Sequence, residues 1–592
     1  MDRIDDSPKE EQRIEGIAVS AGIVSGVAVV RGPSFDEPEV YTIQESDIEK
    51  ERNRFEQALV ETRRQLTSLH KQVRSTIGAD NASIFEAHVM VLEDHSMLKQ
   101  VFDRVEQEKI NIEAAFFGVL TEYKESLRQV GDPYLSERAD DLQDVTRRVL
   151  RNLKPGGTKE SPTESKTDHP HILLAHDLSP SETASIDRGL ILGFATEAGA
   201  QTSHTAIIAR SMNLPATVGL HDIHTLVHTG DEVLLDGYEG VLILHPSPKT
   251  IAHYDRVQVE KEKLQKTLEE IVDQPAETTD GFRVTLSCNI EFSYEVEQVI
   301  KMGGEGIGLY RTEYLYLNQG SMPSEDTLTE EYGRTARGSD PHGTIVRTLD
   351  LGGDKLPGSL IPEEPNPFLG WRGIRVCLEE HEMFMSQLRA ILKASAQGKV
   401  AIMFPMVSCL QELLDAKAVL EEAKASLRSE GLPFDNEIKV GVMIEIPSAA
   451  LIADSLAKEV DFFSIGTNDL VQYTIAVDRV NERVANLYAP HHPAVLRLIQ
   501  MTAEAANRHG IWVGVCGEMA SDILSTPLLV GLGVSELSVS ASQVPFVKRA
   551  IRRLNKKDCE ELVLQVQSAS APEMVTERCR EVALALYPEL LT

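Results

Sequence analysis

Basic side chains recur in the second half of the chain where short apolar runs end. Four of them follow or flank these runs: Arg311, Arg347, Lys355 and Arg372. A guanidinium group binds phosphate or carboxylate oxygens through two parallel hydrogen bonds, and an ammonium group adds a point charge. The residue types and their recurrence therefore predict a site for a small molecule with several negative charges.

Two carboxylates follow later apolar runs of the same region. Glu445 ends one run, and Asp469 ends the next, directly after Asn468. Carboxylate oxygens, together with oxygens of a bound substrate, are the usual ligands of Mg²⁺. The pair therefore predicts a magnesium site beside the anion site. The alternative for each of these charged residues is an ordinary surface salt bridge, but a whole set that recurs at run ends favours a site.

Two further residues have side chains that can exchange a group or a proton. His204 follows a Gly-containing turn and a Thr-Ser pair that suits a helix cap, so it is expected in a first helical turn. Free N–H groups there bind anions and disfavour imidazolium, which leaves a neutral nitrogen able to accept a phosphoryl group. The alternative is a capping or surface histidine. Cys516 ends another apolar run and is a candidate nucleophile or proton donor, or a structural cysteine.

A second group of histidines is a weaker candidate. His224 and His228 stand four residues apart, after His221, and this spacing can hold a metal on one helix face. No matching Cys/His or Glu-His pair accompanies them, so the sequence favours a solvated connection. The chain also contains no Gly-x-x-x-x-Gly-Lys-Ser/Thr loop, which argues against a P-loop nucleotide site.

The apolar runs themselves predict a barrel. Eight of them, most separated by amphipathic helical stretches, form the pattern that a (β/α)8 TIM barrel requires. They are residues 283–290, 306–315, 343–351, 400–407, 440–447, 461–467, 512–516 and 536–540. Reactive groups of such barrels lie where the strands end, at the carboxyl-terminal face. The charged residues are therefore expected to converge there.

The first half of the chain is organised differently. Residues 14–30 are expected to form strands, and a capping-box sequence at Ser46 opens helical periodicity that continues to about residue 153. A break rich in Pro, Gly, Ser and Thr at 155–169 leads to short alternating strand and helix patterns up to residue 246. A charged helical stretch then follows.

These patterns predict a multidomain α/β protein. A small α/β domain carries His204 and contains an inserted all-helical subdomain, and a C-terminal (β/α)8 barrel follows. The expected boundaries are 1–45 and 154–247 for the α/β domain, 46–153 for the helical insertion, 248–275 for a linker helix and 276–592 for the barrel.

The composition excludes several classes of protein. Among 592 residues, 59 Lys+Arg stand against 92 Asp+Glu, a formal net charge of −33, and so acidic a surface repels nucleic-acid backbones. The N-terminus is polar, and the longest nearly apolar stretch, 17–30, is too short to span a bilayer. Six cysteines without disulfide-framework spacing fit a reducing compartment. We therefore expect a cytoplasmic protein without membrane insertion and without a nucleic-acid partner.

Seven stretches, in order along the chain, are similar to a known family. They are GAQTSHTAIIARSMNLPATVG, GIGLYRTEYL, RTLDLGGDK, NPFLGWRGIR, MIEIPSA, FFSIGTNDLVQY and VCGEMASD. Together with the helical stretch IFEAHVMVLED, they resemble Enzyme I of the bacterial sugar phosphotransferase system, the phosphoenolpyruvate-protein phosphotransferases. The resemblance implies transfer of the phosphoryl group of phosphoenolpyruvate to a histidine of the chain and then to a histidine of the phosphocarrier HPr, with Mg²⁺ as cofactor and release of pyruvate.

The resemblance also implies roles for individual residues. His204 is implied as the phosphorylated histidine and Cys516 as the general acid that protonates the enolate carbon. The implied substrate-binding residues are Arg311, Arg347, Lys355, Arg372, Asn468 and Arg479, the implied Mg²⁺ ligands are Glu445 and Asp469, and the implied supports of the histidine are Arg210 and Thr183. The resemblance further implies that HPr docks on the helical insertion 46–153 and that the protein forms a homodimer through the barrel.

The segment beside His204 departs from the family pattern. Glu197 stands where Asp is usual, Ala200 where Gly is usual and Gln201 where Arg is usual, so one positive charge is missing there. Two other classes share features with the chain. A pyruvate phosphate dikinase or phosphoenolpyruvate synthase needs a nucleotide-binding domain, for which residues 1–170 contain no motif. A non-catalytic regulatory homologue usually loses residues that touch the substrate, and none of the implied residues is missing here.

Overall fold

The chain forms two compact units, residues 1–261 and 262–592. The computed structural model describes residues 10–31, 38–76, 88–89, 92, 95–129, 133–154, 169–178, 183, 186, 189–199, 206, 209, 214–317, 322–352, 366–481 and 483–591. The predicted site residues His204, Arg210 and Lys355 lie outside this set, as do Ala200 and Gln201.

The first unit contains a mixed sheet of eight strands in the order β1-β8-β7-β3-β4-β5-β6-β2. The strands are β1 (Gln12–Glu15), β2 (Ile17–Ser20), β3 (Ile23–Arg31), β4 (His171–Ala175), β5 (Ile191–Thr196), β6 (Ala216–Val218), β7 (Glu232–Asp236) and β8 (Val241–Leu244). Neighbours from β3 to β6 pair in parallel, and the remaining neighbours pair antiparallel. Because parallel strands end at one edge, the segments that follow β4 and β5 share that edge.

Alternate residues of β4 enter separate hydrophobic clusters on the two faces of this sheet. Leu173 and Ala175 belong to one cluster, and Ile172 and Leu174 belong to the other. A strand buried on both faces needs such a continuous apolar run. The short helix α8 (Ile223–Leu226) follows β6.

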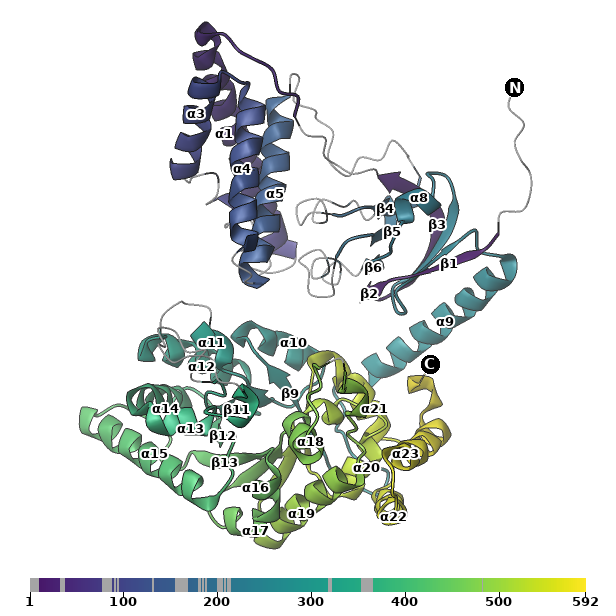
Figure 1. The fold of residues 1–592 in the computed structure, drawn as a ribbon. Coiled ribbons are helices and arrows are strands. Elements are labelled where there is room, and N and C mark those ends of the chain that lie inside the picture. The colour runs from purple at the N-terminus through teal and green to yellow at the C-terminus, as the bar shows by residue number, and fades with distance from the viewer. Residues whose placement is uncertain are drawn as a thin grey trace. The chain divides into compact units, whose positions relative to one another are not determined.

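Four long helices make up the described part of the expected insertion (Figure 1). They are α1 (Ile48–Thr76), α3 (His95–Glu108), α4 (Ile112–Gln129) and α5 (Pro133–Leu153). Their apolar faces meet in one cluster that includes Phe55, Val101 and Phe116. The predicted cap at Ser46 is wrong. The chain enters α1 through a tight turn at Glu45–Asp47, where the Gln44 N–H donates to Asp47 at 3.4 Å.

The second unit is a closed barrel of eight parallel strands, which confirms the predicted (β/α)8 fold (Figure 1). The strands are β9 (Thr285–Ile290), β10 (Ile307–Tyr310), β11 (Thr344–Arg347), β12 (Val400–Phe404), β13 (Lys439–Ile444), β14 (Phe462–Ile465), β15 (Trp512–Val515) and β16 (Glu536–Val539). The barrel closes between β16 and β9, where Leu537 pairs with Leu286.

Helices surround these strands. They are α10 (Val296–Lys301), α11 (Glu313–Leu317), α12 (Glu325–Gly338), α13 (Ile374–Glu379), α14 (His381–Ser395), α15 (Leu410–Glu430), α16 (Pro447–Leu451), α17 (Ala453–Leu456), α18 (Thr467–Ile475), α19 (Pro493–His509), α20 (Thr526–Gly531), α21 (Val544–Ile551), α22 (Lys556–Val566) and α23 (Pro572–Leu586). Helix α9 (Pro248–Glu270) precedes the barrel. Among the described residues, no helix combines the length and the apolar character that crossing a membrane would take.

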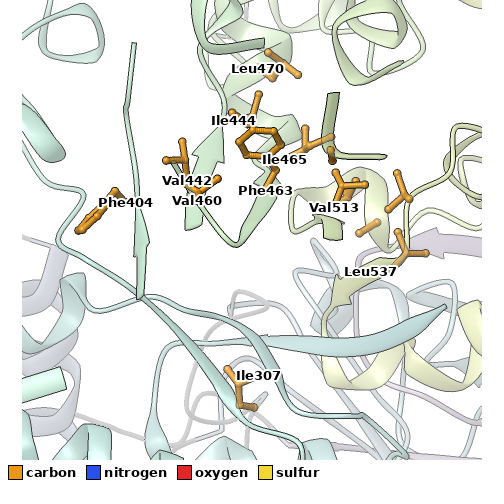
Figure 2. Close-up of a cluster of buried hydrophobic side chains, with 14 of the residues drawn as sticks. Ile307, Phe404, Val442, Ile444, Val460, Phe463, Ile465, Leu470, Val513 and Leu537 are labelled. Atoms are coloured by element: carbon orange, nitrogen blue, oxygen red, sulfur yellow. The ribbon is translucent and has the colours of Figure 1, made fainter. Parts of the chain in front are cut away.

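The two faces of each barrel strand have different neighbours. Val442, Ile444 and Phe463 belong to the large cluster between strands and helices, which Figure 2 shows. Met443 and Phe462, one residue away in each strand, belong to a separate cluster inside the barrel. Since side chains alternate along a strand, Glu445 continues the inward series of Met443 at the end of β13.

Candidate active site

Arg347 is the buried centre of the carboxyl-terminal end of the barrel. It ends β11, and its guanidinium lies 2.9 Å from a Glu313 oxygen and 3.1 Å from an Asp350 oxygen. Burial disfavours its charge, but Glu313, Asp350 and Glu445 outweigh burial and raise the pKa of Arg347 above its usual value. The side chain is therefore a permanent, oriented cation.

Arg372 approaches the same carboxylate from the segment before α13. Its Nη2 donates to both oxygens of Asp350 at 3.0 Å. The guanidinium also lies 4.9 Å from the ring centre of Phe368, and that ring stacks on Tyr473 of α18 with centroids 4.8 Å apart. The Tyr473 hydroxyl donates to the Phe368 carbonyl. These contacts hold the loop and α18 together, so two guanidinium groups converge on Asp350.

Glu445 and Asp469 form the acidic side of this end. Glu445 is completely buried, and its Oε1 accepts the Met406 N–H at 2.6 Å, whereas its Oε2 has no hydrogen-bond partner. Burial raises the pKa of both carboxyls, and Asp350 adds to the effect in each case. Buried like charges with an unsatisfied oxygen are costly without a cation. The cluster therefore fits a divalent metal.

Protein ligands alone do not complete such a site. Within the described ranges, no group of three or more His, Cys, Asp or Glu side chains is arranged to hold a metal ion. Glu445 and Asp469 supply two carboxylates, and Mg²⁺ commonly completes its six oxygen ligands with substrate and water. The donor set fits that arrangement.

The acidic cluster predicts that the loss of one buried carboxylate stabilises the metal-free protein. In the metal-free protein, raised carboxyl pKa values mean that stability falls as pH rises from the unfolded-state pKa through the folded-state pKa. Glu445→Gln removes one buried charge, so its free energy of unfolding at pH 7.5 in chelator should exceed wild type by about 1 kcal/mol. Calorimetry of both proteins measures this. Glu437→Gln, at an exposed carboxylate, is the matched control, and a less stable Glu445→Gln would contradict the prediction.

Cys516 lies directly after β15 and is 3% exposed. Burial raises the pKa of its thiol to about 11, although the Ser464 hydroxyl, Arg347 and Arg311 oppose the shift. The thiol therefore keeps its proton at neutral pH. A protonated thiol beside basic groups is suited to donate a proton to a carbanion, and it is a poor nucleophile in this state.

Three further predicted substrate-binding residues are the buried Asn468 and the more exposed Arg311 and Arg479. Asn468 is the second residue of α18, and its Oδ1 accepts the Glu518 N–H at 2.8 Å. The Arg479 guanidinium donates to the Glu518 carboxylate. Arg311 follows β10 and lies 3.1 Å from an exposed Glu291 oxygen. Weak, exposed pairs of this kind leave the Arg311 and Arg479 guanidinium groups free to rearrange around an anion.

Asp350 and Glu313 are site residues that the sequence motifs alone do not single out. Both are acidic residues in the same motifs as the predicted arginines, and the structure uses them to orient Arg347 and Arg372. The signal was their spacing, because Asp350 follows Arg347 by three residues across the end of a strand. A substrate anion would compete with these carboxylates for the same guanidinium groups.

In the first unit, Glu197 joins two histidines at the sheet edge after β5. Its carboxylate lies 2.6 Å from His176 Nδ1, accepts the His224 N–H at 2.9 Å and contacts His224 Nδ1. Burial would raise the pKa of Glu197, but these donors lower it to about 2. Thr183, a predicted support of His204, is fully buried in this unit.

The alternative metal pair His224 and His228 is not formed. Helix α8 ends at Leu226, so the two residues do not share a helix face. His224 contacts Glu197, and the His228 N–H donates to Asp231 at 2.8 Å. Both histidine side chains are more than half exposed, at 52% and 80%. This agrees with the solvated connection that the sequence favoured.

Three family models match the chain in succession. They are the PEP-utilising enzyme, N-terminal model over residues 15–138, the PEP-utilising enzyme, mobile domain model over 167–240 and the PEP-utilising enzyme, PEP-binding domain model over 265–556. The eight barrel strands and the barrel site residues described above all fall within the third model.

Curated relatives are similar over nearly their full length. The phosphoenolpyruvate-protein phosphotransferase of Staphylococcus carnosus is 42% identical, covering 95% of this chain and 98% of the relative. The proteins of the same name from Priestia megaterium and Bacillus subtilis are 42% and 41% identical, each over 96% of this chain and over 98% and 99% of the relative.

Proposed function

The chain belongs to the phosphoenolpyruvate-protein phosphotransferase family, and we propose that the barrel end around Arg347 binds phosphoenolpyruvate and phosphorylates His204. The observation that carries this assignment is the convergence of Arg347 and Arg372 on Asp350, beside the buried carboxylates Glu445 and Asp469. Two rigid guanidinium groups and a divalent-metal position match a molecule that carries a phosphate and a carboxylate.

The arginines have separate tasks in this proposal. Arg347 and Arg372 exchange their Asp350 contacts for phosphate oxygens and hold the phosphoryl group in line with the attacking nitrogen. Arg311 and Arg479 are more exposed, and Lys355 belongs to the same motif as Arg347. Asn468 orients the substrate from the start of α18. Once the substrate is bound, the charges of these basic groups are in place before the chemical step, so they stabilise the transition state without further reorganisation.

Glu445 and Asp469 would hold Mg²⁺ in this site. Bound there, Mg²⁺ would neutralise negative charge on the phosphate and carboxylate oxygens of the substrate. The unsatisfied Oε2 of Glu445 and the raised pKa values of both carboxyls support the assignment.

Two residues of the chain take part in the bond changes of the proposed reaction: one accepts the phosphoryl group and the other donates a proton. Nε2 of His204 forms a bond to phosphorus as the phosphorus–oxygen bond of phosphoenolpyruvate breaks, which leaves the enolate of pyruvate. The Cys516 thiol donates its proton to the enolate carbon, and solvent later returns a proton to the thiolate. Arg210 and Thr183 support His204 in this scheme, as the family resemblance implies.

The second step passes the phosphoryl group to a carrier protein. We assign that carrier as HPr, with its docking surface on the helical insertion 46–153. The family resemblance carries this assignment. Val60 on α1, at 70% exposure, is accessible on this insertion. A cytoplasmic homodimer associated through the barrel completes the proposal. Six free cysteines, five of them buried, are compatible with a reducing compartment.

Labelled phosphoenolpyruvate tests the function and its metal dependence. With Mg²⁺, the protein should acquire one acid-labile, base-stable phosphate on an imidazole and release one pyruvate, and added HPr should then take up the label. After removal of divalent metals by EDTA, labelling should fall at least about 100-fold and return when Mg²⁺ is restored. Labelling that persists in EDTA would contradict the metal assignment. An acid-stable label would contradict phosphohistidine.

A further inference from the structure

We propose that Asn289 and Ser538 are positioning residues that hold the proton donor Cys516 in place for protonation of the enolate carbon. The inference rests on the proposed function, because it takes Cys516 as the acid. Asn289 Nδ2 donates to the Cys516 carbonyl at 3.0 Å, and the Ser538 hydroxyl donates to Asn289 Oδ1 at 2.7 Å. The three residues come from β9, the end of β15 and β16.

The orientation of the Asn289 amide follows from its partners. A carbonyl oxygen only accepts, so the amide must present its NH₂ group to Cys516. Its oxygen then faces Ser538, and a hydroxyl can donate there. The Cys516 carbonyl therefore selects the amide orientation, and Ser538 anchors it by donating to the amide oxygen.

The Cys516 carbonyl accepts from a side chain, not from a neighbouring strand, because of its position in the chain. Strand β15 ends at Val515, so Cys516 lies one residue beyond it. Its N–H still donates to the Ile465 carbonyl on the β14 side at 3.1 Å. Its carbonyl is held from β9 by Asn289, across a separation of 227 residues. The main chain of the proposed acid is thus held on both sides, which fixes the direction of its Cα–Cβ bond. The thiol itself donates to the Ile465 carbonyl at 3.7 Å.

This part of the barrel interior is polar where branched aliphatic side chains usually dominate. Ser287 and Ser538 are each 2% exposed, and Ser287 donates to Glu536 at 2.6 Å. A Cβ on Gly308 would lie 2.2 Å from the Ser287 hydroxyl and 2.6 Å from the Ser538 hydroxyl. The glycine in β10 thus leaves the space that the two serine hydroxyls occupy. Buried polar groups cost free energy unless bonded, and here Ser287 and Ser538 each have a hydrogen-bond partner, so both side chains are held in one arrangement.

The proposal makes a specific prediction about the enolate. If Cys516 is held firmly, the thiol protonates one face of the enolate before release. If its carbonyl is released, the thiol loses alignment, and enolpyruvate escapes to be protonated by water without facial preference. Phosphoryl transfer, which occurs first, should change less. General acids contribute on the order of 100- to 10,000-fold, so misalignment should slow this step measurably.

The test measures the chirality of the methyl group of pyruvate. Full-length protein is supplied with (Z)-[3-²H,3-³H]phosphoenolpyruvate and Mg²⁺ in ordinary water. Asn289→Asp keeps the size and the Ser538 contact but cannot donate to Cys516. Asn289→Leu removes the polarity without adding charge, and Ser538→Ala removes the hydroxyl that anchors the amide oxygen. Ser287→Ala is the matched control. Ser287 lies on the same face of β9 as Asn289, but its hydroxyl donates to Glu536 and not to Asn289.

We expect wild type and Ser287→Ala to give chiral methyl groups, and the Asn289 and Ser538 variants to lose at least half of the chirality. Phosphohistidine formation in these variants should stay within about tenfold of wild type. Ser538→Ala is the smallest change, and its methyl chirality tests the positioning role if an Asn289 variant does not fold. Full chirality in Ser538→Ala, or equal loss in Ser287→Ala, would overturn the proposal.

The assay separates this inference from the proposed function. If Cys516→Ala gives wild-type chirality while phosphohistidine still forms, Cys516 is not the acid, and the positioning role is overturned while the transferase function stands. If wild-type protein forms no phosphohistidine from phosphoenolpyruvate, the proposed acceptor and the inference both fall.

Discussion

His204→Ala should abolish labelling by phosphoenolpyruvate, with a fall of at least about 10,000-fold in the rate of phosphoryl transfer. The substitution removes the nitrogen to which phosphorus is proposed to bind, and removal of a nucleophile leaves only binding and electrostatic effects. Single-turnover labelling with Mg²⁺ measures the change. The reverse reaction should fail as well, because phosphorylated HPr then has no acceptor in this chain.

The control for this variant is His253→Ala, at an exposed histidine of α9. It should label at the wild-type rate, since it changes the histidine count without touching the proposed acceptor. Barrel binding gives a second check, because His204→Ala should still bind phosphoenolpyruvate at equilibrium. Wild-type labelling of His204→Ala would show that another residue is the acceptor.

Arg347→Lys should lower kcat/KM for phosphoenolpyruvate by about 1,000-fold, or about 4 kcal/mol. Lysine keeps the positive charge but cannot reach Glu313 and Asp350 together while presenting a flat fork to a phosphate. The steady-state rate of pyruvate release measures the effect. Most of the loss should appear in kcat, because the contact matters most as charge redistributes in the transition state.

Exchange with phosphorylated HPr distinguishes a local effect from a general one. This second step does not use the barrel arginines, so Arg347→Lys should exchange label with HPr at the wild-type rate. Arg334→Lys is the matched control, because Arg334 is 54% exposed on α12 and pairs with Glu330 and Glu331. It should leave both steps unchanged. Equal loss in both reactions would place the defect of Arg347→Lys in folding.

The errors in the sequence-based secondary structure are local. Between the apolar runs 440–447 and 461–467, the pattern predicts one amphipathic helical stretch, but the structure has two short helices, α16 and α17, which meet at Ile452, where ψ is 17°. Hydrophobic periodicity does not detect a break of one residue when apolar positions continue on the same face. At the other end of the chain, the expected cap at Ser46 lies inside the turn that precedes α1.

Several parts of the site could be expected from sequence because they depend on neighbouring residues. Glu445 follows a strand with Met443 facing inward, so the two-residue period of a strand already sets its direction. The same holds for Arg347 at the end of β11. The motif residues therefore had to reach one barrel end once the barrel formed.

The sequence by itself determined the eight-stranded barrel and the residues that end its strands, because strand alternation and helix periodicity are local properties. Only the tertiary structure decided which of these side chains share a partner. Asp350 forms ion pairs with both Arg347 and Arg372. Asn289 meets Cys516, because barrel closure brings β9 beside β16 and places the end of β15 within its reach. Such contacts depend on the summed geometry of all eight strands, which no short stretch of sequence contains.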